Sequence, residues 1–262
     1  MALATDLFRF ANDPLGFVYY VYPWGQKGTP LENIYGPRQW QHDILVDVGN
    51  HTKQQEFNLD NGLPLEVYEE ADASGRGIGK SALFGWVSHW NASCHIGSST
   101  IITANTEAQM RSKSFPEFGR WISMSLNSHW FTIDSLKIYP QDWIANLVQE
   151  QLKISPLYWT ITGQNWSEEN PDAFAGMHNM HGLAVLYDEA SGIPNPIWIV
   201  TAGFFTELNP YRYWMAFSNP RRNVGPFFDR FHKAEFLKSW KTRQIDARTV
   251  EGSDQSIYTK II

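Results

Sequence analysis

The sequence predicts an α/β fold in which a mostly parallel sheet is covered by helices on both faces. The first observation is that strand-like alternation is followed by helical spacing, as at 65–71 and 82–90. The second is the nearly apolar run 183–187, because such a run suits a strand buried on both faces of a parallel sheet. The third is the glycine-rich turn at 74–81, which joins the first strand to its helix.

The other elements follow in chain order. Residues 1–35 are rich in aromatic residues, Pro and Gly, so we expect an irregular lead-in there, then a helix over 38–48 and a polar loop over 53–64. Residues 244–262 show no partner elements and are interpreted as a tail or a connection. Further strands are expected at 100–104, 136–139, 158–162 and 213–217, and further helices at 106–121 and 196–205.

The turn at 74–81 reads Ser-Gly-Arg-Gly-Ile-Gly-Lys-Ser and matches the phosphate-binding pattern G-x-x-x-x-G-K-[ST], with Ser74 in place of the first glycine. Its glycines let backbone N–H groups face an anion, Lys80 can reach the β- and γ-phosphates, and the Ser81 hydroxyl can bind Mg²⁺. The dipole of the following helix favours negative charge at the same place. Because the order strand, loop, helix surrounds the motif, it indicates a nucleotide-binding P-loop rather than an ordinary turn. The fold class expected for the chain is accordingly a P-loop NTPase, of the RecA-like (ASCE) type. The predicted nucleotide contacts in the loop are Ser74, Gly75, Arg76, Gly77, Ile78, Gly79, Lys80 and Ser81.

An acid pair, Asp188 and Glu189, ends the apolar strand 183–187. Acids at the carboxyl end of a parallel strand lie where open α/β sheets bind ligands. Asp188 would hold Mg²⁺, directly or through water, and Glu189 would orient and activate the water that attacks the γ-phosphate. The alternative is a solvated pair that caps the next helix. The P-loop earlier in the chain favours the catalytic interpretation.

Composition limits the other classes of function. The chain has 262 residues and a net charge of −6, which argues against a globally basic nucleic-acid binder, although local basic patches such as Arg221 with Arg222 remain. Cys94 is the only cysteine, so an intrachain disulfide is impossible. We expect no signal peptide, because the N-terminus lacks a basic start and Asp6, Arg9 and Asp13 interrupt its apolar residues. We also expect no membrane span, because no apolar stretch approaches the required length of about 20 residues.

Other groups of reactive side chains carry weaker signals. His178 and His181 lie three residues apart, and His89, Cys94 and His95 are close in sequence, but neither set has the spacing of a zinc site. We expect structural roles for all five residues. Most of the 12 tryptophans are expected in the core or at interfaces, with stacking on nucleic-acid bases as the alternative.

Several segments together resemble the ATPase half of phage terminase large subunits, the motors that package DNA into viral capsids. The P-loop and the acid pair are shared with many ATPases, whereas the other segments are more specific. These segments are Asp13–Phe17 with Pro23–Gly25, Trp40-Gln41, Thr103–Gln109, Phe174–His178 and Phe217–Pro220. The resemblance extends over nearly the whole chain.

The resemblance implies roles for further residues. Gln41 lies in a segment similar to the family's adenine-recognition motif, and Arg76 resembles an extra basic loop residue near the γ-phosphate. Ser218 and Asn219 resemble the coupling motif that senses the γ-phosphate. The resemblance also implies an adenine-recognition segment within 1–60, an ATPase core over 61–243 and a tail, 244–262, that leads toward a missing nuclease domain. Asp246, Glu251 and Asp254 near the end are not expected to form a two-metal site, so no nuclease activity is expected.

The function that the resemblance implies is an ATP-hydrolysing, Mg²⁺-dependent motor that moves double-stranded DNA into a procapsid in the host cytoplasm. The implied assembly is a homo-oligomeric ring, commonly a pentamer on the capsid portal, together with portal protein and the small terminase subunit. In such rings an arginine of one subunit completes its neighbour's site, and Arg111 and Arg120 are candidates, although surface helix charges are the alternative. Two other functions stay open, a helicase-like or remodelling P-loop ATPase acting on nucleic acid and a non-catalytic scaffold gated by nucleotide.

Overall fold

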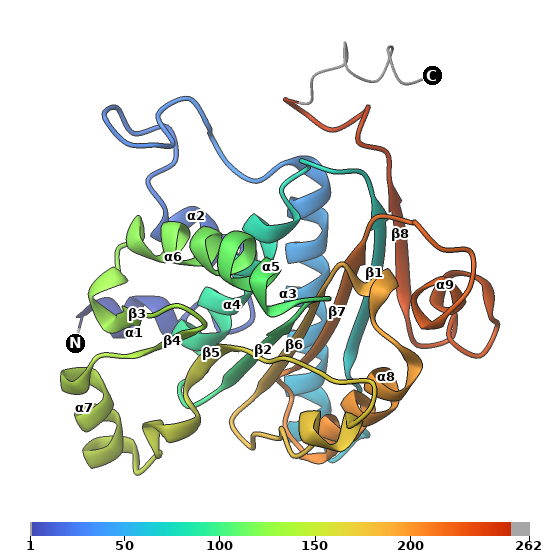
Figure 1. Cartoon of the computed structure of the whole chain (residues 1–262). Helices are drawn as coiled ribbons and strands as arrows, with labels where there is room; N and C mark the ends of the chain where they lie inside the picture. Colours follow the sequence, from blue (N-terminus) through green and yellow to red (C-terminus); the bar gives the residue numbers. More distant parts are fainter. Residues whose placement is uncertain (1, 253–262) are drawn as a thin grey trace.

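The computed structural model describes residues 2–252 and shows one eight-stranded sheet, in the order β3-β4-β5-β2-β6-β7-β1-β8 (Figure 1). The strands β5, β2, β6, β7, β1 and β8, which are neighbours in the sheet, run parallel to one another. In contrast, β4 is antiparallel to both of its neighbours, β3 and β5. The predicted α/β fold with a mostly parallel sheet is confirmed. The strands are β1 (Tyr68–Ser74), β2 (Ser99–Thr103), β3 (Phe131–Ile133), β4 (Lys137–Pro140), β5 (Thr160–Gly163), β6 (Leu183–Asp188), β7 (Arg212–Ser218) and β8 (Lys241–Ile245).

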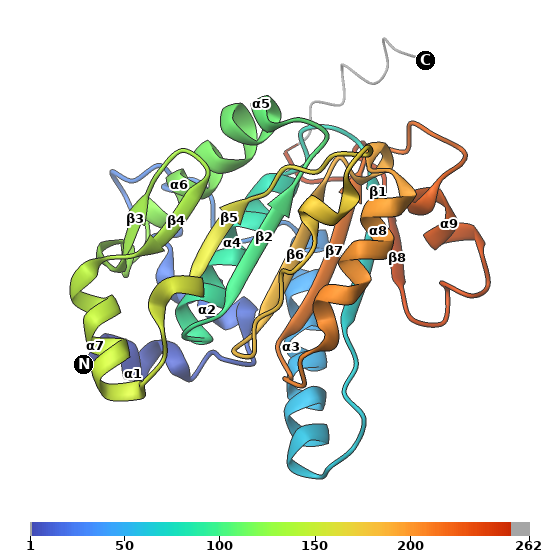
Figure 2. The ribbon, with the colours of Figure 1, turned by 60° about the horizontal axis from the view of Figure 1, so that its bottom comes forward.

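Helices cover both faces of the sheet, and each face has its own apolar core. In Figure 2, α8 lies in front of the strands, whereas α3 and α4 lie behind them. One core is formed with α1 (Ala2–Phe8), α2 (Pro14–Val21), α3 (Gln39–Asp60), α4 (Lys80–Cys94), α6 (Phe115–Ser123) and α7 (Asp142–Leu152). The other is formed with η4 (Pro171–Phe174), η5 (Ala190–Gly192), α8 (Asn195–Ala202), η6 (Gly203–Thr206) and α9 (Pro226–His232).

The helical stretch expected over 106–121 is present, but a π-helical turn interrupts it. It consists of α5 (Glu107–Gln109), the π-helical turn η1 (Met110–Ser114) and α6. Two 3₁₀ turns complete the description, η2 (Ser128–Trp130) and η3 (Pro156–Tyr158). The strand β3 and the helices α7 and α9 have no counterpart among the elements expected from sequence.

The lead-in is more regular than its composition suggested. The expectation of an irregular 1–35 is wrong for 2–8, where α1 forms, and for 14–21. Asp13 caps α2 by accepting the Gly16 N–H at 2.9 Å, and Pro14 starts the helix. Phe17, Val18 and Val21 are buried at helical spacing. The aromatic run thus forms a buried helix face.

The polar loop expected over 53–64 is also wrong for its first part, because α3 continues to Asp60. Thr52 and Gln55 are buried against the sheet, whereas Lys53 and Gln54 face solvent. Residues 53–60 are mostly polar because most of their side chains lie on the solvent-exposed side of α3.

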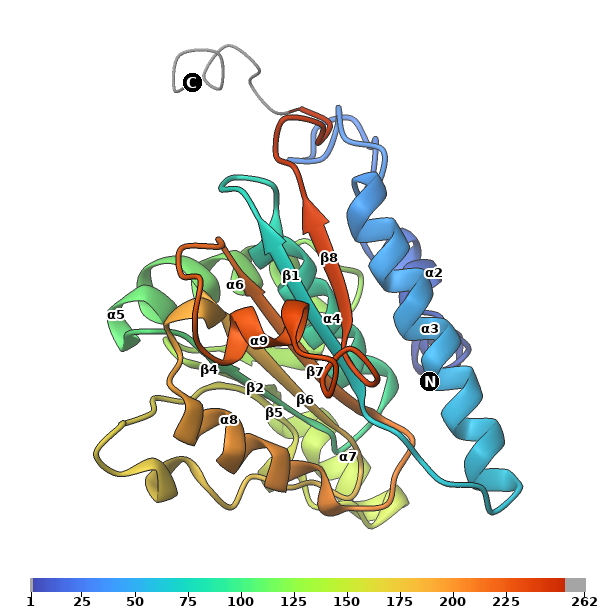
Figure 3. The same cartoon turned by 90° about the vertical axis from the view of Figure 1, so that its right-hand side faces the viewer.

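The expectation that 244–262 has no partner elements is wrong for its first residues. Gln244 and Ile245 belong to β8, which pairs in parallel with β1, and Ala247 and Val250 beyond it are buried. Figure 3 shows β8 beside β1, with α3 and α9 on either side. Residues 253–262, including Asp254, lie outside the described residues.

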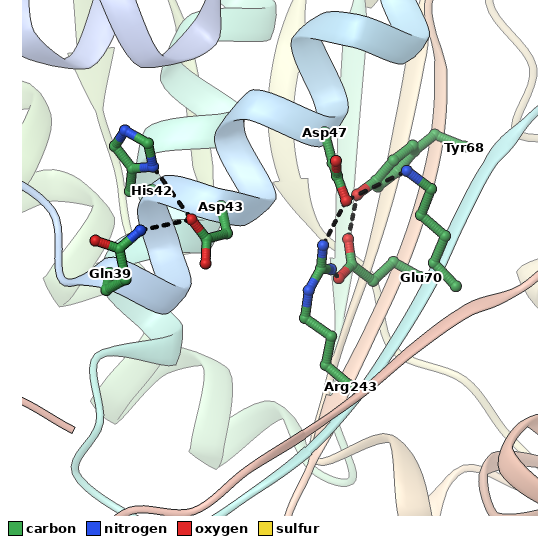
Figure 4. Close-up of polar contacts among 8 residues, drawn as sticks. Gln39, His42, Asp43, Asp47, Tyr68, Glu70 and Arg243 are labelled. Atoms are coloured by element: carbon green, nitrogen blue, oxygen red, sulfur yellow. Dashed lines mark hydrogen bonds and ion pairs between the residues drawn. The ribbon is translucent and has the colours of Figure 1, made fainter. Parts of the chain in front are cut away.

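Charge complementarity explains how β8 docks on β1. The register places Lys241 opposite Glu70 and Arg243 opposite Asp72. Arg243 forms ion pairs with Asp47 of α3, at 2.5 Å, and with the fully buried Glu70 (Figure 4). The Tyr68 hydroxyl donates to the other oxygen of Glu70. A buried carboxylate of this kind is tolerable because it has both a cation and a hydrogen-bond donor beside it.

Candidate phosphate-binding site

The loop between β1 and α4 lies at the carboxyl end of the parallel strands, where β6 and β7 also end. The pairing of β7 with both neighbours aligns Ser218 with Ala73 and Phe217 with Asp188. Three segments that are far apart in sequence therefore converge at one edge of the sheet, as expected for a ligand site in an open α/β fold.

Lys80 is the centre of this edge. Its Nζ donates to the Ser74 hydroxyl at 3.2 Å, to the Gly75 carbonyl at 2.8 Å and to Oδ1 of Asn219 at 3.0 Å. Burial lowers the pKa of Lys80, while Glu189 and Asp188 act in the opposite direction. The lysine thus connects the predicted phosphate loop with the predicted coupling residue, within electrostatic influence of the acid pair.

Two glycines explain the shape of the loop. Gly79 has φ +93° at the start of α4, a conformation that side chains other than glycine rarely adopt. At Gly75 a Cβ atom would lie 2.4 Å from the Cβ of Ala247, in the chain that follows β8. The loop is therefore in close contact with the segment that the sequence placed in an unattached tail.

Gln41 holds the loop from the side of α3. Its Nε2 donates to the Gly79 carbonyl at 2.9 Å, and its Oε1 accepts the Arg38 N–H at 2.9 Å. The side chain is buried, and the Arg38 guanidinium also donates to the Gly77 carbonyl. Each end of the Gln41 amide thus forms one hydrogen bond with backbone, and this residue clamps the loop to the start of α3. Its predicted contact with adenine stays a prediction.

The acid pair is held from two sides. Asp188 is buried, and its Oδ2 accepts the hydroxyl of Ser114 at 2.9 Å. Burial raises the pKa of Asp188, and the Ser114 hydrogen bond opposes this rise. Sequence reasoning missed Ser114. Its only local sign is the π-helical turn η1, a feature that is frequent at functional sites but is not visible in the apolar periodicity.

Glu189 has an unusual backbone. Its φ of +57° and ψ of +44° are left-handed, a conformation that costs a non-glycine residue on the order of 1 kcal/mol or more. Strain of this kind persists where surrounding contacts fix the chain, and here they do. The next turn, η5, is bound to β7 because the Ser191 N–H donates to the Ser218 hydroxyl at 3.1 Å. Asn105 packs so closely on Gly192 that a Cβ there would lie 2.3 Å from its Oδ1.

Of the three arginines named from sequence, one lies on the loop and two lie in the helical stretch 107–123. Arg76 is exposed on the loop. Arg111 pairs with Glu107 at 2.5 Å and Arg120 with Glu117 at 2.8 Å, each within its own helical stretch. Exposed pairs such as these contribute little to stability. Arg111 also donates to the Ser135 hydroxyl, and the Arg120 guanidinium lies 5.2 Å from the centroid of the Trp121 ring.

The donor set at the sheet edge fits Mg²⁺. Ser81, in the first turn of α4, offers a hydroxyl, and Asp188 keeps one carboxylate oxygen outside the Ser114 hydrogen bond. Mg²⁺ prefers such a site, in which one or two protein oxygens are supplemented by water and substrate phosphates. Among residues 2–252 there is no cluster of three or more His, Cys, Asp and Glu side chains that could hold a metal alone.

The other reactive side chains take part in packing. His89 contacts the Tyr22 hydroxyl through Nδ1, and both ring nitrogens of His95 have partners, Asn91 and the Ala11 carbonyl. The Cys94 thiol donates to the Leu7 carbonyl, and burial raises its pKa.

In the part of the chain that the structure describes, no helix has the length and apolar character needed to cross a membrane.

A large open cavity borders the loop. Its volume is about 1480 Å³, and it extends from residues 74–77 along the end of β7 to α9 and to the chain after β8. Arg76, Arg221, Arg222 and Arg248 lie around it. Arg248 is paired with Asp246, another lining residue, at 2.6 Å, so the positive charge beside the loop comes mainly from the other three arginines and favours an anionic ligand.

Comparison with known proteins gives a structural likeness only. No protein-family model matches the sequence, and no curated protein matches it. The fold is similar to the ATPase domain of a phage large terminase. That domain, from Thermus phage P74-26, superposes with a TM-score of 0.48 at 14% sequence identity, over 78% of this chain and 90% of that chain. A mutant of the same domain gives a TM-score of 0.49 at 15% identity, with the same coverage.

Proposed function

We propose that this chain is the ATP-hydrolysing motor domain of a viral DNA-packaging terminase. The observation that supports the proposal most directly is that Lys80 joins two separate segments by hydrogen bonds, the loop residues Ser74 and Gly75 and the β7 terminus at Asn219, while the charges of the acid pair raise its pKa. Phosphoryl transfer needs these components in one place, because it depends almost entirely on positioning and charge stabilisation.

In the proposed reaction, water attacks the γ-phosphate, and the bond between the β–γ bridging oxygen and the γ-phosphorus breaks. Lys80 and the loop N–H groups hold the β- and γ-phosphate oxygens. Ser81 and Asp188 would hold Mg²⁺, which when bound would supply neutralisation of the phosphate charge. Glu189 orients the water and accepts its proton, and Arg76 stabilises the charge that develops on the γ-phosphate.

The contacts of Asn219 suggest how hydrolysis is sensed. A γ-phosphate bound at Lys80 would compete with Oδ1 of Asn219 for Nζ. Ser218, the preceding residue, holds the turn that follows Glu189. Movement of Asn219 would thereby reach both the catalytic acid and the end of β7, which is the role proposed for the coupling pair.

The assembly belongs to the proposal as well. We infer a homo-oligomeric ring, a pentamer on the capsid portal, in the host cytoplasm, with double-stranded DNA, portal protein and the small terminase subunit as partners. Arg111 or Arg120 would then enter the neighbouring subunit's site. If so, ATP turnover per subunit falls when the ring dissociates on dilution, and a rate that stays constant through dissociation would exclude an arginine in trans.

Steady-state ATP hydrolysis tests the proposal, measured with and without duplex DNA beside the molecular mass in solution. We expect Lys80→Ala to lower turnover by at least about 100-fold, because it removes the central phosphate contact. Lys53→Ala, an exposed lysine of α3, is the matched control and should leave turnover unchanged. A wild-type protein that binds Mg·ATP without multiple turnover would contradict the enzymatic assignment.

A substrate-based assay separates packaging from the helicase-like alternative. A motor that moves along intact duplex should displace a third strand from a triplex while the duplex strands stay paired. Strand separation of a forked duplex would instead indicate a helicase-like ATPase.

A further inference from the structure

The phosphate loop is held between two segments that are far apart in sequence. One is the start of α3, where the Gln41 amide donates to the Gly79 carbonyl at 2.9 Å. The other is the turn 246–251, which follows β8 and packs on Gly75. Surface loops are mobile unless contacts of this kind fix them, so the two segments decide how firmly the loop keeps its shape.

The turn 246–251 is held together by its own contacts. The N–H and the hydroxyl of Thr249 each donate to the Asp246 carbonyl at 2.9 Å. The turn places Ala247 and Val250 in the apolar core on the α3 side of the sheet, where they are 5% and 6% exposed. Burial of these two side chains fixes the position of the turn relative to the sheet.

Both ends of the turn are anchored. Before it, β8 is docked on β1 through the ion pair of Arg243 with the buried Glu70. At its far end, Oε1 of Glu251 accepts the N–H of Gln39, the first residue of α3, at 3.2 Å. The helix dipole favours a carboxylate at that position. The turn therefore reaches from β8 to the start of α3, beside the loop (Figure 3).

Gly75 shows that the loop is fitted closely to this turn. A Cβ atom at Gly75 would lie 2.4 Å from the Cβ of Ala247, whereas the next nearest atoms, also of Ala247, would lie at the ordinary contact distances of 3.7 and 3.8 Å. Gly75 has no positive φ, so its backbone conformation alone does not require glycine. Among the described residues, it is therefore the Ala247 methyl group that excludes a side chain at Gly75.

The same glycine supplies an acceptor to Lys80. The Lys80 Nζ donates to the Gly75 carbonyl at 2.8 Å, a shorter contact than those with Ser74 and Asn219. A shift of Gly75 would move this acceptor and would turn the loop N–H groups away from an anion. The contact between Ala247 and Gly75 can in this way set the affinity of the loop for phosphate.

We propose that the turn 246–251 is a brace that holds the phosphate loop in its anion-binding shape, with Ala247 and Glu251 as positioning residues. The proposal rests on the proposed function, since it assumes that the loop binds phosphate. It makes the affinity for phosphate depend on the docking of the chain that follows β8. Because such coupling is reciprocal, phosphate bound at the loop also stabilises the docked turn.

A double-mutant cycle tests the contact on the full chain, with Mg·ATP and inorganic tripolyphosphate as probes and calorimetry as the measurement. Gly75→Ala places a methyl group against Ala247, and we expect the affinity for both probes to fall about tenfold, within the usual coupling range for two residues in contact. Ala247→Gly alone should change either affinity by less than about threefold. In the double variant the space is restored, so both affinities should return to within about threefold of the wild type.

Steady-state hydrolysis gives a second readout of the same cycle. The KM for ATP should rise in Gly75→Ala and return in the double variant, while kcat changes less, because saturating nucleotide re-forms the loop. A side chain that served only the stability of the fold would not produce this reversal. Urea unfolding of each variant shows whether it is folded under the conditions of the assay.

The other anchor offers a test that leaves the loop unchanged and that decides the question if Gly75→Ala does not fold. Glu251→Ala frees the end of the turn from Gln39 and should weaken both probes several-fold, whereas Glu251→Gln keeps an acceptor and should retain affinity. Thr249→Ala is the matched control, because Thr249 is exposed and its N–H keeps the Asp246 carbonyl as its acceptor. It should change neither affinity.

The outcomes separate this proposal from the ATPase proposal. Normal affinity in Gly75→Ala, a loss that Ala247→Gly does not reverse, or unchanged affinity in Glu251→Ala would overturn the brace and leave the ATPase intact. Tripolyphosphate affinities that follow the cycle in a chain without ATP turnover would support the brace and contradict the ATPase. A wild-type chain that binds neither probe would overturn both proposals.

Discussion

The hydroxyl of Ser114 donates to Oδ2 of Asp188 across 2.9 Å, and both side chains are buried. The bond joins the π-helical turn after α5 to the end of the central strand β6. It fixes the rotation of the carboxylate and leaves the second oxygen for another partner. Ser114 is thereby a positioning residue for the proposed Mg²⁺ ligand.

We expect Ser114→Ala to raise the Mg²⁺ concentration needed for half-maximal ATP hydrolysis several-fold, because Asp188 loses its orienting donor. It should also lower the free energy of unfolding by about 1–3 kcal/mol, the usual effect of leaving a buried acceptor unpaired. Ser114→Thr retains the hydroxyl and should restore most of the Mg²⁺ response. Ser112→Ala is the matched control, since Ser112 lies in the same turn but is exposed and donates only to the Ala108 carbonyl. An unaltered Mg²⁺ response in Ser114→Ala would contradict the positioning role.

Glu189 combines strain with its proposed chemistry, and substitution separates the two. Glu189→Gly removes the left-handed penalty, so the free energy of unfolding should rise by about 1 kcal/mol while hydrolysis is lost. Glu189→Gln retains the strain, and hydrolysis should fall by about 10²–10⁴-fold with little change in stability or ATP affinity. Chemical denaturation and turnover measure both effects. Hydrolysis that survives in Glu189→Gln would remove this residue from the catalytic role.

The docking of β8 depends on Arg243 more than on Lys241. Arg243→Ala leaves Glu70 as a buried carboxylate without its cation, and we expect the free energy of unfolding to fall by about 3–5 kcal/mol. Lys241→Ala removes only an exposed pair with Asp47 and should lower the free energy by less than about 1 kcal/mol. Urea unfolding of the two variants gives the comparison. Equal effects would indicate that β8 is held by its backbone pairing alone.

Buried histidines predict loss of stability in mild acid. Burial lowers the pKa of His89 to about 3, and of His51 and His95 to about 4. The unfolded chain therefore binds more protons below pH 6.5, so stabilisation present above that pH is lost as the pH falls toward 4. The lowered pKa of each histidine should reduce the free energy of unfolding of the protein by about 2 kcal/mol between pH 7 and pH 5. His51→Asn, measured by urea unfolding, should reduce this pH dependence by about one histidine's share. An unchanged dependence would show that His51 takes up its proton over the same pH range in the folded and the unfolded chain.

Asp72 should change the free energy of unfolding with pH in the opposite direction to the histidines, and so tests the predicted direction of both effects. This residue of β1 is fully buried, neither oxygen has a hydrogen-bond partner in the described structure, and burial raises its pKa well above the usual value. Stabilisation is therefore present in acid and is lost as the pH rises through the raised pKa. Asp72→Asn should thus be more stable than the wild type at pH 7, with the difference shrinking toward pH 4.

Much of the site was predictable because its signals are local. The turn at 74–81 carries its own glycines, lysine and hydroxyl, and β6 carries both its apolar run and the acids that end it. Parallel strands in one sheet bring such ends together. By contrast, aromatic residues in 14–21 and polar residues in 53–60 obscured two helices, because the composition of a short segment reflects the face that it presents as much as its backbone conformation.

The sequence by itself determined the strand–loop–helix unit around Lys80, the acid-ended strand and the α/β class, since each depends on residues that are neighbours in the chain. Only the tertiary structure decided the partners of those residues. Ser114 reaches Asp188 from 74 positions away, and Gln41 reaches Gly79 from 38 positions away. Likewise, β8 lies beside β1 because Arg243 meets Glu70 and Asp47. Contacts of this kind depend on the register of distant segments and on the buried charges that it pairs, which no local periodicity encodes.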